Sequence, residues 1–257
     1  MKAFVLMATF AGTFWTDLSY EEEGTGSPVL LLHGLSVDTQ QNWRAPGIWS
    51  ALVDAGHRVI GFDARGHGRS GKPHDPAAYE EDAMVKDVAA CFDQLGLTGV
   101  DLAGYSMGAS TALQFAARDG RVRRLVLGGI GGDPQQWGAE DGRSAMRSRW
   151  LAGIEATDPA ALEDPVTRGA RRVFEARGND LEAIAALLRA NRRHLSPDMA
   201  SAAVAIPTLV VCGDRDASPT ELASALPEGE ALVIEGDHES AVTNPELAAA
   251  IVRFFTD

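Results

Sequence analysis

The sequence predicts an α/β fold: a mainly parallel sheet of eight strands with helices on both faces and a small helical cap. Three observations predict it. Short apolar runs alternate with helix-like stretches along most of the 257 residues, the runs are almost continuously aliphatic, and one long helix-rich segment interrupts the alternation. Parallel strands need crossover connections, usually helices, and strands that are covered on both faces have near-continuous apolar sequences.

Six aliphatic runs are the expected parallel strands, and they lie at residues 29–32, 58–62, 100–103, 124–127, 208–212 and 231–234. Two earlier segments, 4–9 and 13–20, are expected to add an antiparallel edge. The first of these follows a lysine and has a faint likeness to a signal peptide, but no small-x-small cleavage site comes after it. We therefore expect a strand there.

Four stretches have apolar residues at three- and four-residue spacing, which predicts helices that pack on the sheet. They are residues 48–55, 79–95, 107–118 and 245–255. Residues 133–205 are rich in Arg and Ala and contain no convincing strand, which indicates an inserted helical cap. The core is thus expected in two parts, 1–132 and 206–257, with the cap between them.

The charge balance excludes several classes of partner. Thirty-six acidic against 23 basic side chains give a net charge of −13, which repels nucleic-acid backbones and anionic membrane surfaces.

No apolar run approaches the roughly 18 residues that a membrane span needs. Cys91 and Cys212 have no metal-site spacing and are expected to be buried thiols in a reducing cytosol. We expect a cytoplasmic protein that acts on a small molecule.

A G-x-S-x-G pattern, Gly104-Tyr105-Ser106-Met107-Gly108, marks the candidate nucleophile. The pattern alone is weak, but here it directly follows a predicted strand and directly precedes a predicted helix. A serine in so tight a turn needs very small residues two positions away on either side, and glycine fills both. The helix that begins here points free amides and the positive end of its dipole at the serine, so the Met107 amide is an expected oxyanion donor.

A serine hydroxyl needs a base within hydrogen-bond reach and a third group that orients the base. His238 has the best context of the six histidines, because it follows the last predicted strand and precedes the last predicted helix. That places it at the carboxyl edge of the sheet, where open α/β sheets bind their ligands. Surface or turn roles are favoured for four others: His57, His67, His74 and His194.

The orienting carboxylate is expected after the strand at 208–212. The sequence there continues Gly213-Asp214-Arg215-Asp216, which leaves Asp214 and Asp216 as candidates. With either one, the order along the chain is serine, aspartate, histidine. That order is typical of α/β-hydrolases and differs from the orders in two unrelated protease folds.

Together with residues 31–34 (Leu-Leu-His-Gly) and 62–70, these motifs make nearly the whole chain resemble the α/β-hydrolase superfamily. The similarity is to the small single-cap enzymes, which include esterases, enol-lactonases and C–C bond hydrolases. The resemblance implies that Asp216, three residues after the glycine, is the triad acid and that Asp214 is a turn or capping residue. Relatives that carry the acid after the sixth strand would place it at Asp133 instead.

The resemblance also implies that Leu35 donates the second oxyanion amide and that His33 is a structural residue of the same loop. Four large side chains of the expected cap either line an apolar substrate pocket or form the core of the cap itself: Trp137, Met146, Trp150 and Phe174. The sequence has no dinucleotide fingerprint after a strand, no H-E-x-x-H motif and no phosphate loop, so neither a cofactor nor a metal is expected.

The expected function is hydrolysis of a small carboxylic ester by acyl transfer through Ser106, His238 and Asp216. An apolar or aromatic acyl group is favoured, because the pocket candidates are apolar and no basic cluster lies near the serine. Lactonase, thioesterase and C–C hydrolase activities use the same residues and stay open, since a fold does not fix a reaction. A small-molecule receptor or signalling protein on a hydrolase scaffold also stays open.

Overall fold

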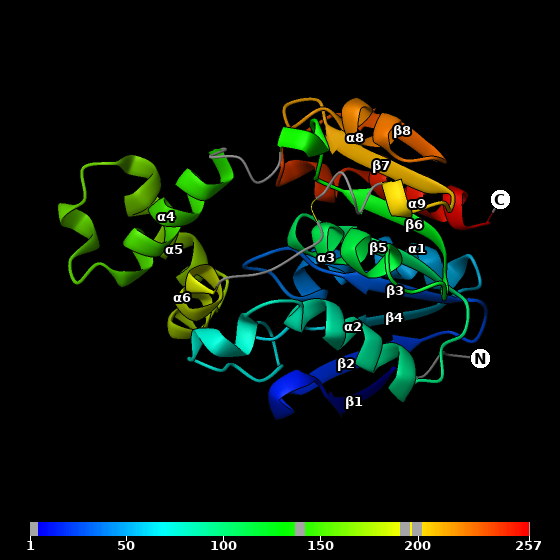
Figure 1. Ribbon diagram of the computed structural model, residues 1–257, viewed down its shortest axis with the longest axis horizontal. Helices are drawn as coiled ribbons and strands as arrows, with labels where there is room; N and C mark the ends of the chain where they lie inside the picture. Colours follow the sequence, from blue (N-terminus) through cyan, green and yellow to red (C-terminus); the bar gives the residue numbers. More distant parts are fainter. Residues whose placement is uncertain (1–4, 137–141, 191–195, 197–201, 257) are drawn as a thin grey trace.

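The computed structural model describes residues 5–136, 142–190, 196 and 202–256, and it contains the predicted eight-stranded sheet (Figure 1). The strand order is β1-β2-β4-β3-β5-β6-β7-β8. The pairs β1–β2 and β2–β4 are antiparallel and the other pairs are parallel, which confirms the mainly parallel sheet with an antiparallel edge. The strands are β1 Leu6–Ala11, β2 Asp17–Glu23, β3 Pro28–Leu32, β4 Arg58–Phe62, β5 Val100–Tyr105, β6 Val122–Gly128, β7 Thr208–Gly213 and β8 Gly229–Ile234.

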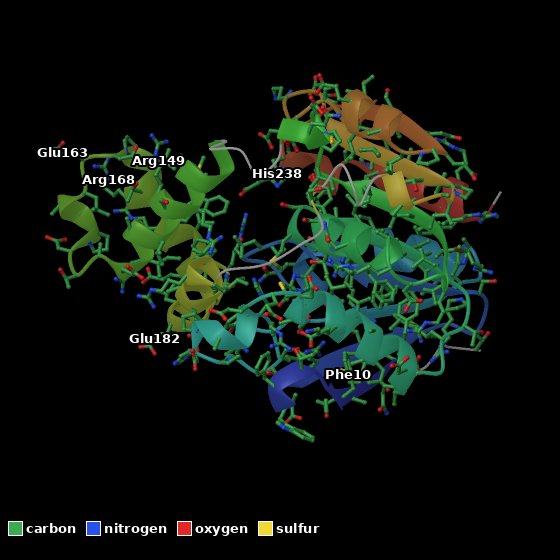
Figure 2. The ribbon with its side chains drawn as sticks, in the orientation of Figure 1. Phe10, Arg149, Glu163, Arg168, Glu182 and His238 are labelled. Atoms are coloured by element: carbon green, nitrogen blue, oxygen red, sulfur yellow. The ribbon has the colours of Figure 1, made fainter. Side chains whose placement is uncertain are left out.

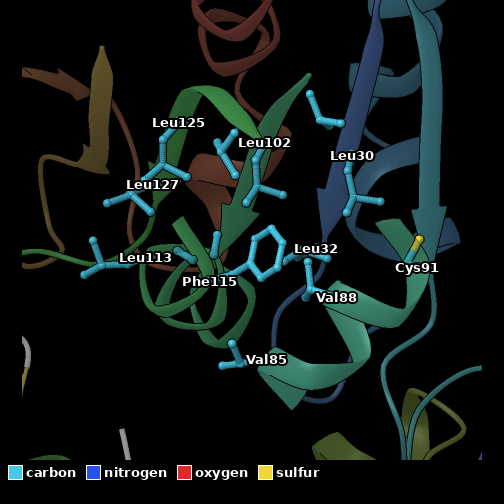
Figure 3. Close-up of a cluster of buried hydrophobic side chains, with 14 of the residues drawn as sticks. Leu30, Leu32, Val85, Val88, Cys91, Leu102, Leu113, Phe115, Leu125 and Leu127 are labelled. Carbon is cyan, nitrogen blue, oxygen red and sulfur yellow. The ribbon is translucent and has the colours of Figure 1, made fainter. Parts of the chain in front are cut away.

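Helices cover both faces of the sheet, as predicted. They are α1 Ile48–Asp54, α2 Ala83–Gln94, α3 Met107–Ala116, α8 Pro219–Ala225 and α9 Pro245–Thr256. Successive side chains of a strand point to opposite faces of its sheet. Leu30 and Leu32 therefore join the apolar cluster that includes α2 and α3, whereas Val29 and Leu31 join the cluster that includes α1 and α9. Figure 3 shows the first of these two layers.

The strand predicted at 13–20 is wrong in its first half. Residues Thr13–Trp15 form a 3₁₀ turn, and β2 begins only at Asp17. Phe14 and Trp15 have left-handed φ angles of 53° and 56°. The chain needs this turn because β1 and β2 pair antiparallel with only a short connection between them, which forces an abrupt reversal.

Two helices also differ from the prediction. The helix predicted at 79–95 begins at Ala83, because Glu81 has a φ angle of 49° and interrupts the helical path after a short 3₁₀ turn. Helix α8 was not predicted at all. Ser218 caps its N-terminus and Pro219 occupies its first position. This combination is typical of helix starts and is the sequence feature that indicates a helix here.

Between β6 and β7, three α-helices of the described residues lie to one side of the sheet (Figure 1), and we call them the cap helices. They are α4 Gly142–Glu155, α5 Pro165–Ala176 and α6 Leu181–Arg189. They have an apolar cluster of their own, in which Ile154, Phe174 and Leu188 are buried. Elsewhere, both cysteines are buried free thiols, as expected. Within the described ranges, no helix has the length and apolar character required to cross a membrane.

Candidate active site

Ser106 lies at the sharp turn between β5 and α3. Its backbone has φ 53° and ψ −110°, a conformation that L residues rarely adopt. Two glycines allow the turn. A Cβ at position 104 would lie 2.4 Å from the Gly108 carbonyl carbon, and one at position 108 would lie 2.1 Å from the Leu32 oxygen. The Ser106 amide donates to the Gly128 oxygen at 2.8 Å, which ties the strained residue to β6.

The structure brings Ser106, His238 and Asp216 into one hydrogen-bonded chain. His238 Nε2 lies 2.9 Å from Ser106 Oγ, and His238 Nδ1 lies 2.7 Å from Asp216 Oδ2. A carboxylate only accepts, so Nδ1 carries the proton and Nε2 is left to accept from the serine hydroxyl. The Ala217 amide donates to the second Asp216 oxygen, Oδ1, at 2.8 Å and fixes the carboxylate. The arrangement is able to withdraw a proton from the serine.

The other two acid candidates have different partners. Asp214 Oδ1 accepts the Gly236 amide at 2.9 Å, so this side chain joins the loop after β7 to the loop that carries His238. Asp133 Oδ1 accepts the Gln135 amide at 2.9 Å, within the turn that follows β6. Of the three carboxylates, Asp216 is the one that contacts the imidazole.

The electrostatics of the imidazole favour its charged form. The hydrogen bond that His238 Nδ1 donates to Asp216 raises the pKa of His238 above its usual value, against an opposing effect of burial. Tyr105 helps to fix the histidine loop, because its hydroxyl donates to the His238 carbonyl oxygen at 2.9 Å. The role of Tyr105 was not predicted, since the second position of a G-x-S-x-G pattern carries no such signal.

The predicted oxyanion residues flank the serine. Met107 is the first residue of α3, and Leu35 lies in the loop after β3. Neither backbone amide donates a hydrogen bond to any residue that the structure describes. Asn42 holds the same loop, because its Oδ1 accepts the Gly34 amide at 2.9 Å. The sequence around Asn42 carries no motif that marks this role.

The buried histidines have structural surroundings. His33 Nδ1 donates to the Gly34 oxygen and Nε2 accepts the Ala64 amide, both at 2.8 Å, so the ring joins two loops beside the serine. The His67 ring packs 5.2 Å from that of His33, and burial lowers the pKa of His67 to about 3. Exposed His74 contacts Asp180 of the cap. His194 lies outside the described residues.

A cavity of about 760 Å³ opens above the serine, between the core and the cap helices. Ser106, His238 and Leu35 line it from the core. Figure 2 shows His238 on the side of the core that faces the cap helices. Of the predicted pocket residues, Trp150 and Phe174 line the cavity, Met146 does not, and Trp137 lies outside the described residues. Among the residues that the structure describes, no group of three or more His, Cys, Asp or Glu side chains has metal-binding geometry.

Comparison with known proteins gives the same family from sequence and from structure. The family described as alpha/beta hydrolase fold matches residues 27–181. The 2-hydroxymuconate semialdehyde hydrolase of a Pseudomonas species is 33% identical over 211 residues, which are 76% of this chain and 72% of that protein. A non-heme haloperoxidase of Rhodococcus erythropolis is 37% identical over 117 residues, 44% of this chain but only 40% of that protein.

Two solved structures are similar over almost their whole length. An esterase from Thermogutta terrifontis has a TM-score of 0.73 and 28% identity, with 98% of each chain covered. The enol-lactonase from Burkholderia xenovorans has a TM-score of 0.70 and 25% identity, with 97% of this chain and 100% of that chain covered. The family match spans more than half of the chain, and the fold and the sharp turn at Ser106 agree with it. The chain belongs to the α/β-hydrolase fold family.

Proposed function

We propose that the protein is a serine hydrolase that cleaves small carboxylic esters by acyl transfer. The observation that carries the proposal is the continuous contact from Asp216 through His238 to Ser106, at 2.7 and 2.9 Å, at the wall of a 760 Å³ cavity. The strained backbone of Ser106 supports it, since strain of this kind clusters at functional sites.

The proposed reaction has two acyl-transfer steps. Ser106 Oγ attacks the ester carbonyl while His238 takes its proton, and Asp216 stabilises the imidazolium. The amides of Leu35 and Met107 stabilise the negative oxygen of the tetrahedral intermediate. When that intermediate collapses, His238 protonates the leaving alcohol. Water, deprotonated by His238, then attacks the acyl-enzyme and releases the acid.

The lining of the cavity favours an apolar acyl or alcohol group. Much of its wall is aliphatic or aromatic: Val37, Trp150, Val173, Phe174 and Val242. A second candidate is C–C bond or lactone hydrolysis, because a 2-hydroxymuconate semialdehyde hydrolase and an enol-lactonase match most of this chain. The same three side chains serve each reaction, so the substrate decides between them.

A panel of p-nitrophenyl esters of graded acyl length tests the substrate class. We expect turnover that rises with apolar acyl size until the cavity is filled and then falls. A fluorophosphonate probe is expected to form a P–O bond to Ser106 Oγ with loss of fluoride, to add the mass of the probe less HF, and to stop turnover. Preference for an enol lactone or for 2-hydroxymuconate semialdehyde over every ester would favour the second candidate. No Ser106-dependent turnover of any of these compounds would overturn the proposal.

The pH profile is expected to have an acidic limb with a midpoint above 6.5. Neutral imidazole is the base, and the Asp216 hydrogen bond raises the pKa of His238 above 6.5, so kcat/KM is lost as the pH falls through that raised pKa. The free energy of unfolding depends on pH in the opposite direction. The contribution of the His238–Asp216 pair to it is complete below pH 6.5 and is lost as the pH rises through the folded-state pKa of His238. Steady-state kinetics in buffers of constant ionic strength measure the limb, and a midpoint at or below 6.5 would contradict the assignment.

A further inference from the structure

One cap residue, Arg177, contacts both loops that flank the serine. Its Nη1 donates to the Oγ of Ser36, the residue after Leu35, at 2.6 Å. Its Nη2 lies 3.0 Å from the Oε1 of Glu239, the residue after His238. A single guanidinium thus joins the cap helices to the loop after β3, which contains Leu35 and which we call the oxyanion loop, and to the loop after β8, which contains His238 and which we call the histidine loop.

The local backbone fixes the place of this guanidinium. Arg177 is the C-cap residue directly after α5, and Gly178, with a φ of 75°, ends the helix in the left-handed conformation that is usual there. The Arg177 carbonyl accepts from Gln41 Nε2 at 3.2 Å, so the main chain of the turn is also tied to the core. A planar guanidinium presents several donors in a rigid fork, so it can keep both contacts at once with a fixed geometry, whereas the ammonium of a lysine is a single point charge.

Ser36 shows why the oxyanion loop needs support. It is a buried, non-glycine residue with a φ of 69°. Such a conformation persists only where the surroundings enforce it. Two of its polar groups are held by residues that follow α5: Arg177 donates to its hydroxyl oxygen, and Asn179 Nδ2 donates to its carbonyl oxygen at 2.8 Å. Without these contacts, Ser36 is free to relax and to carry Leu35 with it.

We propose that Arg177 is a positioning residue, which holds the Leu35 and His238 loops in the arrangement that acyl transfer requires. The inference rests on the proposed function and deepens it, because it makes the cap part of the catalytic geometry. Displacements of about 1 Å cost on the order of 100-fold in rate when reacting groups are otherwise aligned. We therefore expect Arg177→Met to lower kcat by about 10- to 100-fold, with a smaller change in KM.

The pH profile separates positioning from general support of the fold. The charged or polar groups around the imidazole are Ser106, Asp216, Asp237, Glu239 and Tyr105, with Arg177 against Glu239. Glu239 favours the imidazolium, and Arg177 offsets that charge. Arg177→Met should move the acidic limb of kcat/KM up by about half a unit, whereas Glu239→Gln should move it down. The double variant should return it close to the wild-type position.

The experiment compares kcat, KM, the acidic limb and the rate of fluorophosphonate labelling in these variants. Arg172→Met is the matched control, because Arg172 is exposed on the same helix, and it should behave as the wild type in every assay. Arg177→Lys should restore the limb and only part of kcat. Since the probe is small, slower labelling of Arg177→Met reports misplaced catalytic groups rather than lost substrate contacts.

Several outcomes would overturn the inference alone. With a wild-type enzyme that is active, any one of three results for Arg177→Met would do so: a kcat equal to that of the wild type, an acidic limb of kcat/KM at the wild-type pH, or an unchanged rate of labelling. If Arg177→Met does not fold, Glu239→Gln and Ser36→Ala each remove one contact, and wild-type behaviour of both would reject the role. Absence of turnover and labelling in the wild type would instead overturn the proposed function, and this inference with it.

Discussion

Replacing Ser106 with alanine is expected to lower kcat by about 10⁴-fold or more. The reason is that the Ser106 hydroxyl is the only protein group that forms a bond to the acyl carbon in the proposed reaction. The cavity, the amides of Leu35 and Met107, and the His238–Asp216 pair all remain. What is left should therefore be slow hydrolysis by water in a pocket that still binds substrate, with KM little changed.

Steady-state assays on the best ester of the panel measure this effect. Ser110→Ala is the matched control, since Ser110 lies one turn further along α3 and its amide merely donates to the Ser106 oxygen. It should retain nearly all activity. If Ser106→Ala kept more than a tenth of the wild-type kcat, another group would have to be the nucleophile.

Replacing Asp216 with asparagine is expected to lower kcat by about 10³- to 10⁴-fold. The amide keeps the shape of the carboxylate but removes its charge, so the imidazolium loses its stabilising partner. The amide NH₂ is also able to donate to Nδ1, which would move the imidazole proton to Nε2. In that tautomer, His238 cannot accept the proton of Ser106.

Asp214→Asn gives the same charge change two residues away and separates the two aspartates. Asparagine at 214 can still accept the Gly236 amide, so the loop contact survives and kcat should stay within about threefold of wild type. Urea unfolding of both variants measures their free energies of unfolding and checks that a lower kcat does not come from a loss of folded protein. Equal losses in the two variants would mean that the contact between Asp216 and His238 is not what catalysis needs.

Local sequence was sufficient for most of the fold. Aliphatic runs predicted the six parallel strands at least in part, because strands covered on both faces have near-continuous apolar sequences. The two earlier segments, 4–9 and 13–20, each predicted part of an antiparallel edge strand. Prediction failed where long-range geometry set the backbone. The turn at Thr13–Trp15 exists because two strands must pair, and nothing within those three residues requires a left-handed φ.

The candidate site divides in the same way. Ser106 was identifiable because a nucleophile turn needs glycines at fixed offsets, and His238 because it follows the last strand. Residues at 214 and 216 differ by two positions in one loop, so only the folded loop decides which carboxylate faces the imidazole. The sequence also could not place Asn42, Tyr105 or Arg177 at the site.

The sequence by itself determined the sheet, and it predicted a cap insertion and the residues whose expected role depends on neighbours along the chain. The tertiary structure decided whether Asp216, which the resemblance favours, meets His238 and which residue between β6 and β7 reaches both loops. The physical reason is the range of the forces involved. Strand burial and turn sterics act between residues close in sequence, whereas a hydrogen bond such as that from Arg177 to Ser36 depends on how separate elements pack.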